Sequence, residues 1–152
     1  MDAEFDTNLR RFQMERYEAF GPTLLRTALG VVFLVHSVYL KVIVFTVPGT
    51  VAFFESLGLP GFSAYAVLLV EAIGGSLLIL GVGVRQTALA LAVVSLGATW
   101  AHIGYGWLFT NEGGGWEYPL FLSIACFTQA LLGPGALKIE YASTLRRPVW
   151  VR

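Results

Sequence analysis

Four long apolar stretches follow one another along the chain, and short gaps containing glycine, proline or charged residues separate them. Sequences such as VVFLV, AYAVLLV and TALALAVVSLGA are almost continuously apolar. A helix needs about 20 apolar residues to cross a hydrocarbon core about 30 Å thick. The pattern therefore predicts an all-α integral membrane protein, a bundle of four transmembrane helices at Pro22–Val47, Ser63–Gly83, Gln86–Leu108 and Trp116–Leu132.

Glycine and proline mark the ends of these predicted helices. The Gly-Pro pair at 21–22 is expected to begin the first helix, and the Pro-Gly pair at 48–49 is expected to end it. A second Pro-Gly pair at 60–61 separates the first helix from the second, and Gly-Pro-Gly at 133–135 ends the fourth. The positions of glycine and proline thus agree with the helix ends that the apolar pattern predicts.

Composition strengthens the membrane assignment. Hydrophobic residues make up 56% of the 152 residues and charged residues only 13%, which leaves too few polar side chains to cover a soluble domain. We expect an N-terminal cytoplasmic segment over 1–21, one four-helix membrane domain over 22–135 and a basic cytoplasmic tail over 136–152. Residues 9–20 suit either an amphipathic helix on the membrane surface or a frayed polar tail. Nothing indicates a nucleic-acid surface.

Lysine and arginine predict the orientation, because they are concentrated in short cytoplasmic loops. The connections at 48–62 and 109–115 contain neither residue and are expected outside. The other polar segments contain Arg10, Arg11, Arg16, Arg85, Lys138, Arg146, Arg147 and Arg152. Both termini are therefore expected in the cytoplasm, with the protein as a multi-pass component of the inner (plasma) membrane.

Several ionisable residues fall inside the apolar stretches, where each costs at least about 2.5–3.5 kcal/mol unless it is paired or hydrated. Arg26 is near the cytoplasmic end and is expected either to reach the headgroups or to join an internal polar site. The helical rise places the others from the midplane to the outer half of the membrane. These are His36, Lys41, Glu71, His102 and Glu117.

Helical spacing places these residues on faces rich in small side chains. On the third predicted helix one such stripe contains Ala88, Ala92, Ser95, Thr99, His102 and Gly106. On the second, Glu71 shares a face with Gly74, Gly75 and Leu78. On the first, the corresponding face contains Arg26, Gly30, Ser37 and Lys41, with His36 to one side. Each face is expected to point into the bundle.

Two hypotheses account for this cluster. In one, Lys41 and Glu71 form an ion pair that fixes helix register, and the histidines are merely hydrogen-bonded. In the other, the groups line a polar pocket in the outer half that binds a small molecule, a quinone headgroup or protons. Haem held by both histidines is disfavoured by their different depths. A metal site of His36, His102, Glu71 and Glu117 is sterically conceivable, but no ligand spacing supports it and none is predicted.

The sequence also resembles the DoxX family of small four-helix membrane proteins. The matching stretches are LLRTALGVVFLVHSVYLK, FFESLGLPGFSAYAVLLVEAIGGSLLILGVGVR, AHIGYGW, GGGWEYPLFL and LLGPG, which together run from Leu24 to Gly135. Ser37 stands where the family typically has glycine. The resemblance implies a membrane redox role, as in relatives of a thiosulfate:quinone oxidoreductase subunit, and it points to Arg26, His36, Lys41, Glu71, His102, Trp116 and Glu117.

We therefore expect a DoxX-like subunit of a quinone-linked or otherwise redox-related membrane complex. Whether the chain is itself an oxidoreductase is left open, and quinone is the cofactor that the resemblance suggests. The alternatives are a small-molecule or proton-coupled carrier, or a membrane scaffold for a redox enzyme. The expected partners are the lipid bilayer, a redox partner protein and further copies of the chain.

Overall fold

The computed structural model describes the backbone of residues 2–139 and the side chains of residues 17–139. These residues form helices and no strand. The elements are α1 (Asp2–Leu34), the π-helix η1 (Val35–Val44), α2 (Val47–Ser56), α3 (Phe62–Leu80), α4 (Val84–His102), the short 3₁₀-helix η2 (Ile103–Tyr105) and α5 (Glu117–Leu132). The all-helical prediction is confirmed.

Three helical segments are long and apolar enough to cross a membrane, and a fourth is shorter. The long segments are Tyr17–Val44, Phe62–Leu80 and Val84–Tyr105. The fourth, α5, has 16 residues and is also apolar. At a rise of about 1.5 Å per residue α5 is about 24 Å long, several ångströms short of a typical hydrocarbon core. The chain is thus a multi-pass membrane protein.

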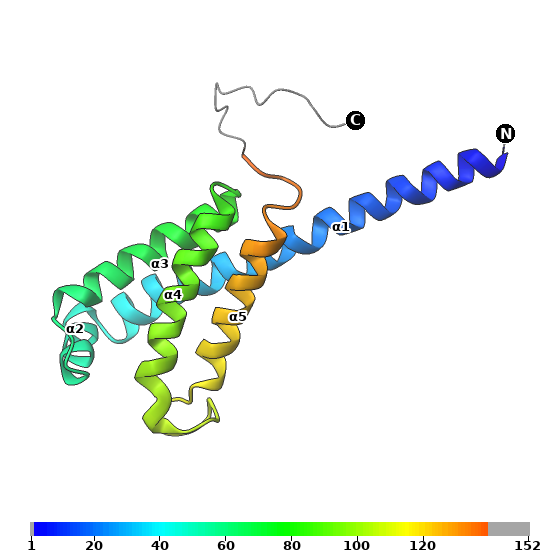
Figure 1. Cartoon of the computed structure of the whole chain (residues 1–152). Coiled ribbons are helices and arrows are strands. Elements are labelled where there is room, and N and C mark those ends of the chain that lie inside the picture. The colour runs from blue at the N-terminus through cyan, green and yellow to red at the C-terminus, as the bar shows by residue number, and fades with distance from the viewer. Residues whose placement is uncertain (1, 140–152) are drawn as a thin grey trace.

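The helices pack into an elongated bundle from which α1 projects (Figure 1). α4 and α5 run side by side in opposite directions, and α3 packs against both α4 and the second half of α1. α2 and the connection between α4 and α5 lie toward one end of the bundle. We call this the Lys41 end, and we call the opposite end, where α3 and α5 finish, the Arg26 end.

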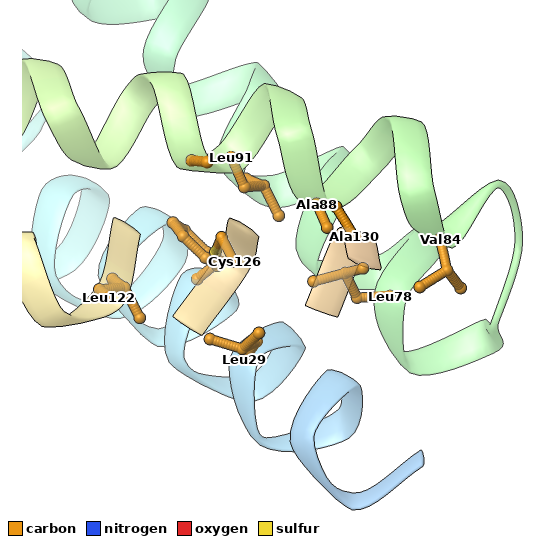
Figure 2. Close-up of a cluster of buried hydrophobic side chains, with 10 residues drawn as sticks. Leu29, Leu78, Val84, Ala88, Leu91, Leu122, Cys126 and Ala130 are labelled. Atoms are coloured by element: carbon orange, nitrogen blue, oxygen red, sulfur yellow. The ribbon is translucent and has the colours of Figure 1, made fainter. Parts of the chain in front are cut away.

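A small apolar core holds the four long elements together (Figure 2). Leu29 of α1, Leu78 of α3, Leu91 of α4 and Cys126 of α5 are all buried in it. Large apolar side chains such as Leu131 remain 79% exposed. In water such a surface would be costly, whereas lipid tails cover it readily.

Glycines allow the helices to approach closely, as the small-residue faces predict. A Cβ atom added to Gly30 would lie 2.6 Å from the carbonyl oxygen of Gly75, and one added to Gly75 would lie 2.8 Å from that of Gly30. Both contacts are too short for real carbon atoms. α1 and α3 therefore cross with backbone against backbone, as is common in membranes.

The predicted inward faces are confirmed. On α3, Glu71, Gly74, Gly75 and Leu78 are all buried. On α4, Ala88, Ala92 and Ser95 are buried, and the stripe becomes half-buried at Thr99, His102 and Gly106. On the first helical segment, Arg26, Gly30 and Ser37 are buried and Lys41 is half-buried.

The predicted start of the first helix is wrong. α1 begins at Asp2 and passes through Pro22 without ending. Proline breaks a backbone hydrogen bond, but hydroxyl groups and neighbouring segments can satisfy the freed carbonyls. The carbonyl that Pro22 leaves without a donor is that of Glu18, four residues earlier. Next to it, the carbonyl oxygen of Ala19 accepts from the Thr23 hydroxyl at 3.0 Å and from the backbone nitrogen of Ala136 at 3.0 Å, which supports the helix at this point. Residues 9–20 are therefore helical and not frayed at the backbone.

The first helical segment does not end because of the Pro-Gly pair at 48–49, as the sequence predicts. The last ten helical residues are wound as a π-helix, which ends at Val44. Thr46 then adopts φ 62° and ψ 155°, a conformation that is strained for a β-branched residue. Pro48 lies in the first turn of α2, so it helps to begin a helix.

The other boundaries lie closer to the predictions. α3 ends three residues before Gly83, because Gly81 takes up a left-handed conformation. α4 begins at Val84 and ends at His102, where η2 follows, so it ends six residues before the predicted Leu108. α5 differs from its predicted range only in beginning at Glu117.

Candidate functional site at the Lys41 end

The Lys41 side chain of η1 forms an ion pair with Glu71 of α3. Their side chains are 19% and 7% exposed, so both charges are largely removed from solvent. Ion pairing is how a membrane protein compensates charges at such depth. The predicted pair therefore forms, which agrees with both of the hypotheses that the sequence left open.

Two further hydrogen bonds fix η1 next to this pair. The Ser37 hydroxyl donates to the carbonyl oxygen of Leu68 on α3 at 2.9 Å. The Thr50 hydroxyl of α2 donates to the carbonyl oxygen of Lys41 itself, also at 2.9 Å. The backbone that presents Lys41 is thus held from both sides.

His36 lies one turn before Lys41 and contacts the start of α5. Its ring stacks on Tyr118, with 5.9 Å between ring centroids and 18° between ring planes. Its Nδ1 atom lies 2.9 Å from the carbonyl oxygen of Val32. The contact with Tyr118 links η1 to α5, in addition to the link between η1 and α3 through Lys41 and Glu71.

His102, the last residue of α4, lies among aromatic rings. Its ring centroid is 6.2 Å from that of Phe53 on α2 and 5.8 Å from that of Tyr105 on η2. Its Nδ1 atom lies 2.8 Å from the carbonyl oxygen of Ala98. α2 therefore contacts both the backbone of Lys41, through Thr50, and the ring of His102, through Phe53.

The connection between α4 and α5 folds back on itself and positions Trp116 and Glu117. The Trp116 ring packs edge-on against Trp107, with 4.4 Å between centroids. A carboxylate oxygen of Glu117 accepts from the backbone nitrogen of Phe109 at 2.9 Å. Both residues consequently have defined roles in holding this loop, and Glu117 also places a negative charge at the N-terminus of α5.

Arg26 lies apart from this cluster. It is 1% exposed, and its guanidinium donates to the carbonyl oxygens of Leu78, Ile79, Pro134, Ala136 and Leu137 at 2.6–3.1 Å. The expectation that Arg26 extends to the headgroups is wrong, because the ends of α3 and α5 supply its partners. A cation is also well placed there, since helix C-termini carry partial negative charge.

The cluster does not resemble a metal centre. Among the described residues, no three histidine, cysteine, aspartate or glutamate side chains are placed to hold an ion together. The arrangement of His36, His102, Glu71 and Glu117 around one metal is therefore contradicted. Glu71 pairs with Lys41 instead, and Glu117 caps the loop backbone.

Sequence reasoning missed three aromatic neighbours of the histidines. Phe53, Tyr105 and Tyr118 contact the two imidazole rings directly. Aromatic residues near the ends of membrane helices usually form an interfacial belt, and this general pattern gave no signal for the contacts. Only the packing of α2, η2 and α5 brings them to the histidines.

Family comparison decides the identity of the bundle. A family model described as DoxX matches residues 21–104. The chain belongs to the DoxX family. The matched range contains Arg26, His36, Lys41, Glu71 and His102, whereas Trp116 and Glu117 lie beyond it.

A curated protein from Bacillus subtilis (strain 168), named "Putative oxidoreductase CatD", is similar to this DoxX chain. The two are 35% identical over 85 residues, which is 56% of this chain and 61% of the relative. The chain thus spans about three fifths of that relative's length. No solved structure matches the chain significantly.

Proposed function

We propose that this DoxX protein is a subunit of a quinone-linked redox complex in the inner (plasma) membrane, and that it binds the quinone headgroup in a polar pocket at the Lys41 end. The observation that carries the proposal is the difference between the two ends of the bundle. Cations with protein partners occur at both ends, but their hydrogen-bonding capacity is used differently.

At the Arg26 end the cations serve the backbone. Arg26 donates to five carbonyl oxygens, and Arg85 donates to those of Ala130 and Leu131. The bonds to α3 and α5 satisfy carbonyls at the ends of these helices, which otherwise lack partners. The other three bonds of Arg26 fix the segment that follows α5. The Arg26 end is therefore fully explained by its structural role.

At the Lys41 end, hydrogen-bonding capacity is left over. Lys41 has three donor hydrogens, of which the ion pair with Glu71 uses one. Among the described residues, each histidine hydrogen-bonds through Nδ1 alone. Ionisable groups that a stable bundle does not need are costly in a membrane, which favours a binding role for Lys41, His36 and His102.

The aromatic surroundings suit a flat ligand. Phe53, Tyr105 and Tyr118 lie against the two imidazoles and offer ring faces and edges. A quinone headgroup is a flat ring with polar oxygens, and it reaches such a site from the bilayer. The redox description in the name of the relative from Bacillus subtilis supports this ligand class.

We further propose that α5 completes a four-span bundle with both termini in the cytoplasm. The turn that carries Arg85 and the Arg26 end then face the cytoplasm, while the Lys41 end faces outward. Residues 1–21 and 136–152 are the cytoplasmic segments in this arrangement. Leu122, Cys126 and Ala130 pack into the core along most of α5, as a spanning helix requires.

A scaffold function is the second candidate, and the shape of α1 favours it. The first part of α1 continues beyond the bundle (Figure 1). An extended helix of this kind offers a partner redox enzyme, or a further copy of the chain, a place to dock. In that case Lys41 and Glu71 would act only as the register-fixing ion pair.

Substitution of the ion pair separates the two candidates. We expect Lys41→Met and Glu71→Gln each to abolish binding of a short-chain quinone, measured by titration of the purified protein, while both variants stay folded. The double substitution should not restore binding. If the pair is only structural, each single substitution will instead lower the free energy of unfolding by about 3–5 kcal/mol. The double substitution will then restore that stability.

A further inference from the structure

Both histidines at the Lys41 end use the same ring nitrogen in the same way. Nδ1 of His36 lies 2.9 Å from the Val32 carbonyl oxygen, and Nδ1 of His102 lies 2.8 Å from the Ala98 carbonyl oxygen. A carbonyl oxygen can only accept a hydrogen bond, so Nδ1 must carry the proton in each ring. In a neutral imidazole, Nε2 is then the bare nitrogen and acts as an acceptor.

Neither Nε2 atom is used by the protein. Within residues 17–139, no group hydrogen-bonds to Nε2 of His36 or of His102. Both rings are half-buried, so a ligand can reach them, and neither Nε2 is among the buried atoms that lack a partner. Each Nε2 is therefore open to a hydrogen-bond donor from outside the chain, such as a ligand hydroxyl.

The cation at this end does not discriminate between ligand forms. The Lys41 ammonium can donate equally to a hydroxyl oxygen and to a carbonyl oxygen. The two imidazoles differ from it, because a bare Nε2 can bond to a hydroxyl hydrogen and has nothing to offer a carbonyl oxygen. His36 and His102 thus each favour a ligand that carries a hydroxyl group.

We infer that these two histidines select an aromatic ligand that carries hydroxyl groups, such as a phenol or the reduced form of a quinone, over the carbonyl-bearing oxidised form. The inference rests on the proposed function, since it names the ligand form that the same site prefers. It concerns binding alone: a ligand hydroxyl donates to Nε2, and no covalent bond is made or broken. Tyr118 beside His36 and Phe53 beside His102 offer aromatic surface to a flat ligand.

Three probes with one carbon skeleton test this preference. Duroquinol carries two hydroxyl hydrogens, duroquinone carries none, and the dimethyl ether of duroquinol keeps the aromatic ring but has lost both donors. Isothermal titration calorimetry of the full-length protein, without oxygen, should show duroquinol binding at least about ten-fold tighter than duroquinone, the scale of one hydrogen bond. The dimethyl ether should lose this advantage.

Variants assign the effect to the histidines. His36→Phe and His102→Phe keep a flat ring and remove Nε2, so each should reduce the affinity for duroquinol more than that for duroquinone. Glu112→Gln, an exposed change in the loop at the same end, should alter neither affinity.

The possible failures are distinguishable. Equal binding of duroquinol and duroquinone, or tight binding of the dimethyl ether, would overturn the inference and leave the proposed function standing. If none of the three probes binds, both are overturned. The comparison of duroquinol with its dimethyl ether uses the unmodified protein. It therefore tests the inference whether or not the phenylalanine variants fold.

Discussion

Arg26 and Lys41 lie on one continuous helical segment, yet they are paired with different kinds of group. Arg26 donates only to backbone carbonyl oxygens, whereas Lys41 donates to the Glu71 carboxylate. The planar guanidinium can serve several carbonyls at once, which a lysine ammonium cannot do with the same geometry. Each residue type thus matches its position.

Loss of Arg26 should therefore destabilise the fold strongly. In Arg26→Met, five buried or half-buried carbonyl oxygens lose a charged donor, and we expect a loss of more than about 3 kcal/mol in the free energy of unfolding. Arg26→Lys should recover only part of it. Thermal unfolding in detergent, followed by circular dichroism, gives the measurement.

Arg85→Met is the matched control for this prediction. Arg85 is exposed and donates to two carbonyl oxygens, so its loss should cost about 1 kcal/mol. Similar stabilities for Arg26→Met and the unmodified protein would refute the structural role of Arg26.

At the scale of helices, the crossing of α1 and α3 depends on Gly30 and Gly75. A methyl group at Gly30 would meet the Gly75 carbonyl oxygen at 2.6 Å, and backbone cannot move aside as a flexible side chain can. Gly30→Ala should cost at least about 1–3 kcal/mol in the free energy of unfolding.

A second glycine separates this packing effect from helix propensity. Gly97 lies on α4, and nothing is within 4 Å of a Cβ atom built there. Gly97→Ala should leave the stability unchanged or raise it by about 1 kcal/mol. Equal effects of the two substitutions on the unfolding temperature would show that α1 and α3 do not cross as described.

The sequence predicts the helices and their inward faces well, because both follow from hydrophobic length and helical spacing. It fails at Pro22, where α1 continues and the Thr23 hydroxyl and the backbone of Ala136 support the neighbouring Ala19 carbonyl. It also gives no sign that η1 is a π-helix, a form frequent at functional sites. Such features depend on tertiary contacts that no local pattern encodes.

The sequence predicts part of the candidate site, namely the ion pair, but not its aromatic neighbours. The cost of burying charge identifies Lys41 and Glu71 in the sequence, and the structure joins them. The aromatic neighbours of His36 and His102 come from α2, η2 and α5, so their positions depend on how the helices assemble. The partners of Arg26 could not be predicted, since they are backbone carbonyl oxygens, which every residue has.

For the whole molecule, the distribution of lysine and arginine predicts which end faces the cytoplasm. Cysteine labelling in intact cells tests it, in a background where the buried Cys126 is replaced by alanine. Glu112→Cys should react with a membrane-impermeant maleimide added outside. Gln86→Cys, in the first turn of α4 at the opposite end, should react only after permeabilisation, and the reverse pattern would contradict the proposed orientation.

The central claim is that the Lys41 end binds a quinone-class ligand, and the ligand content of the purified protein tests it most directly. The protein is isolated in mild detergent, and its extracted lipids are analysed for quinone and quinol. We expect equimolar ligand in the unmodified protein and in Glu112→Gln, and none in Glu71→Gln. Preparations free of quinone and quinol, or ligand retained equally by Glu71→Gln, would contradict the account.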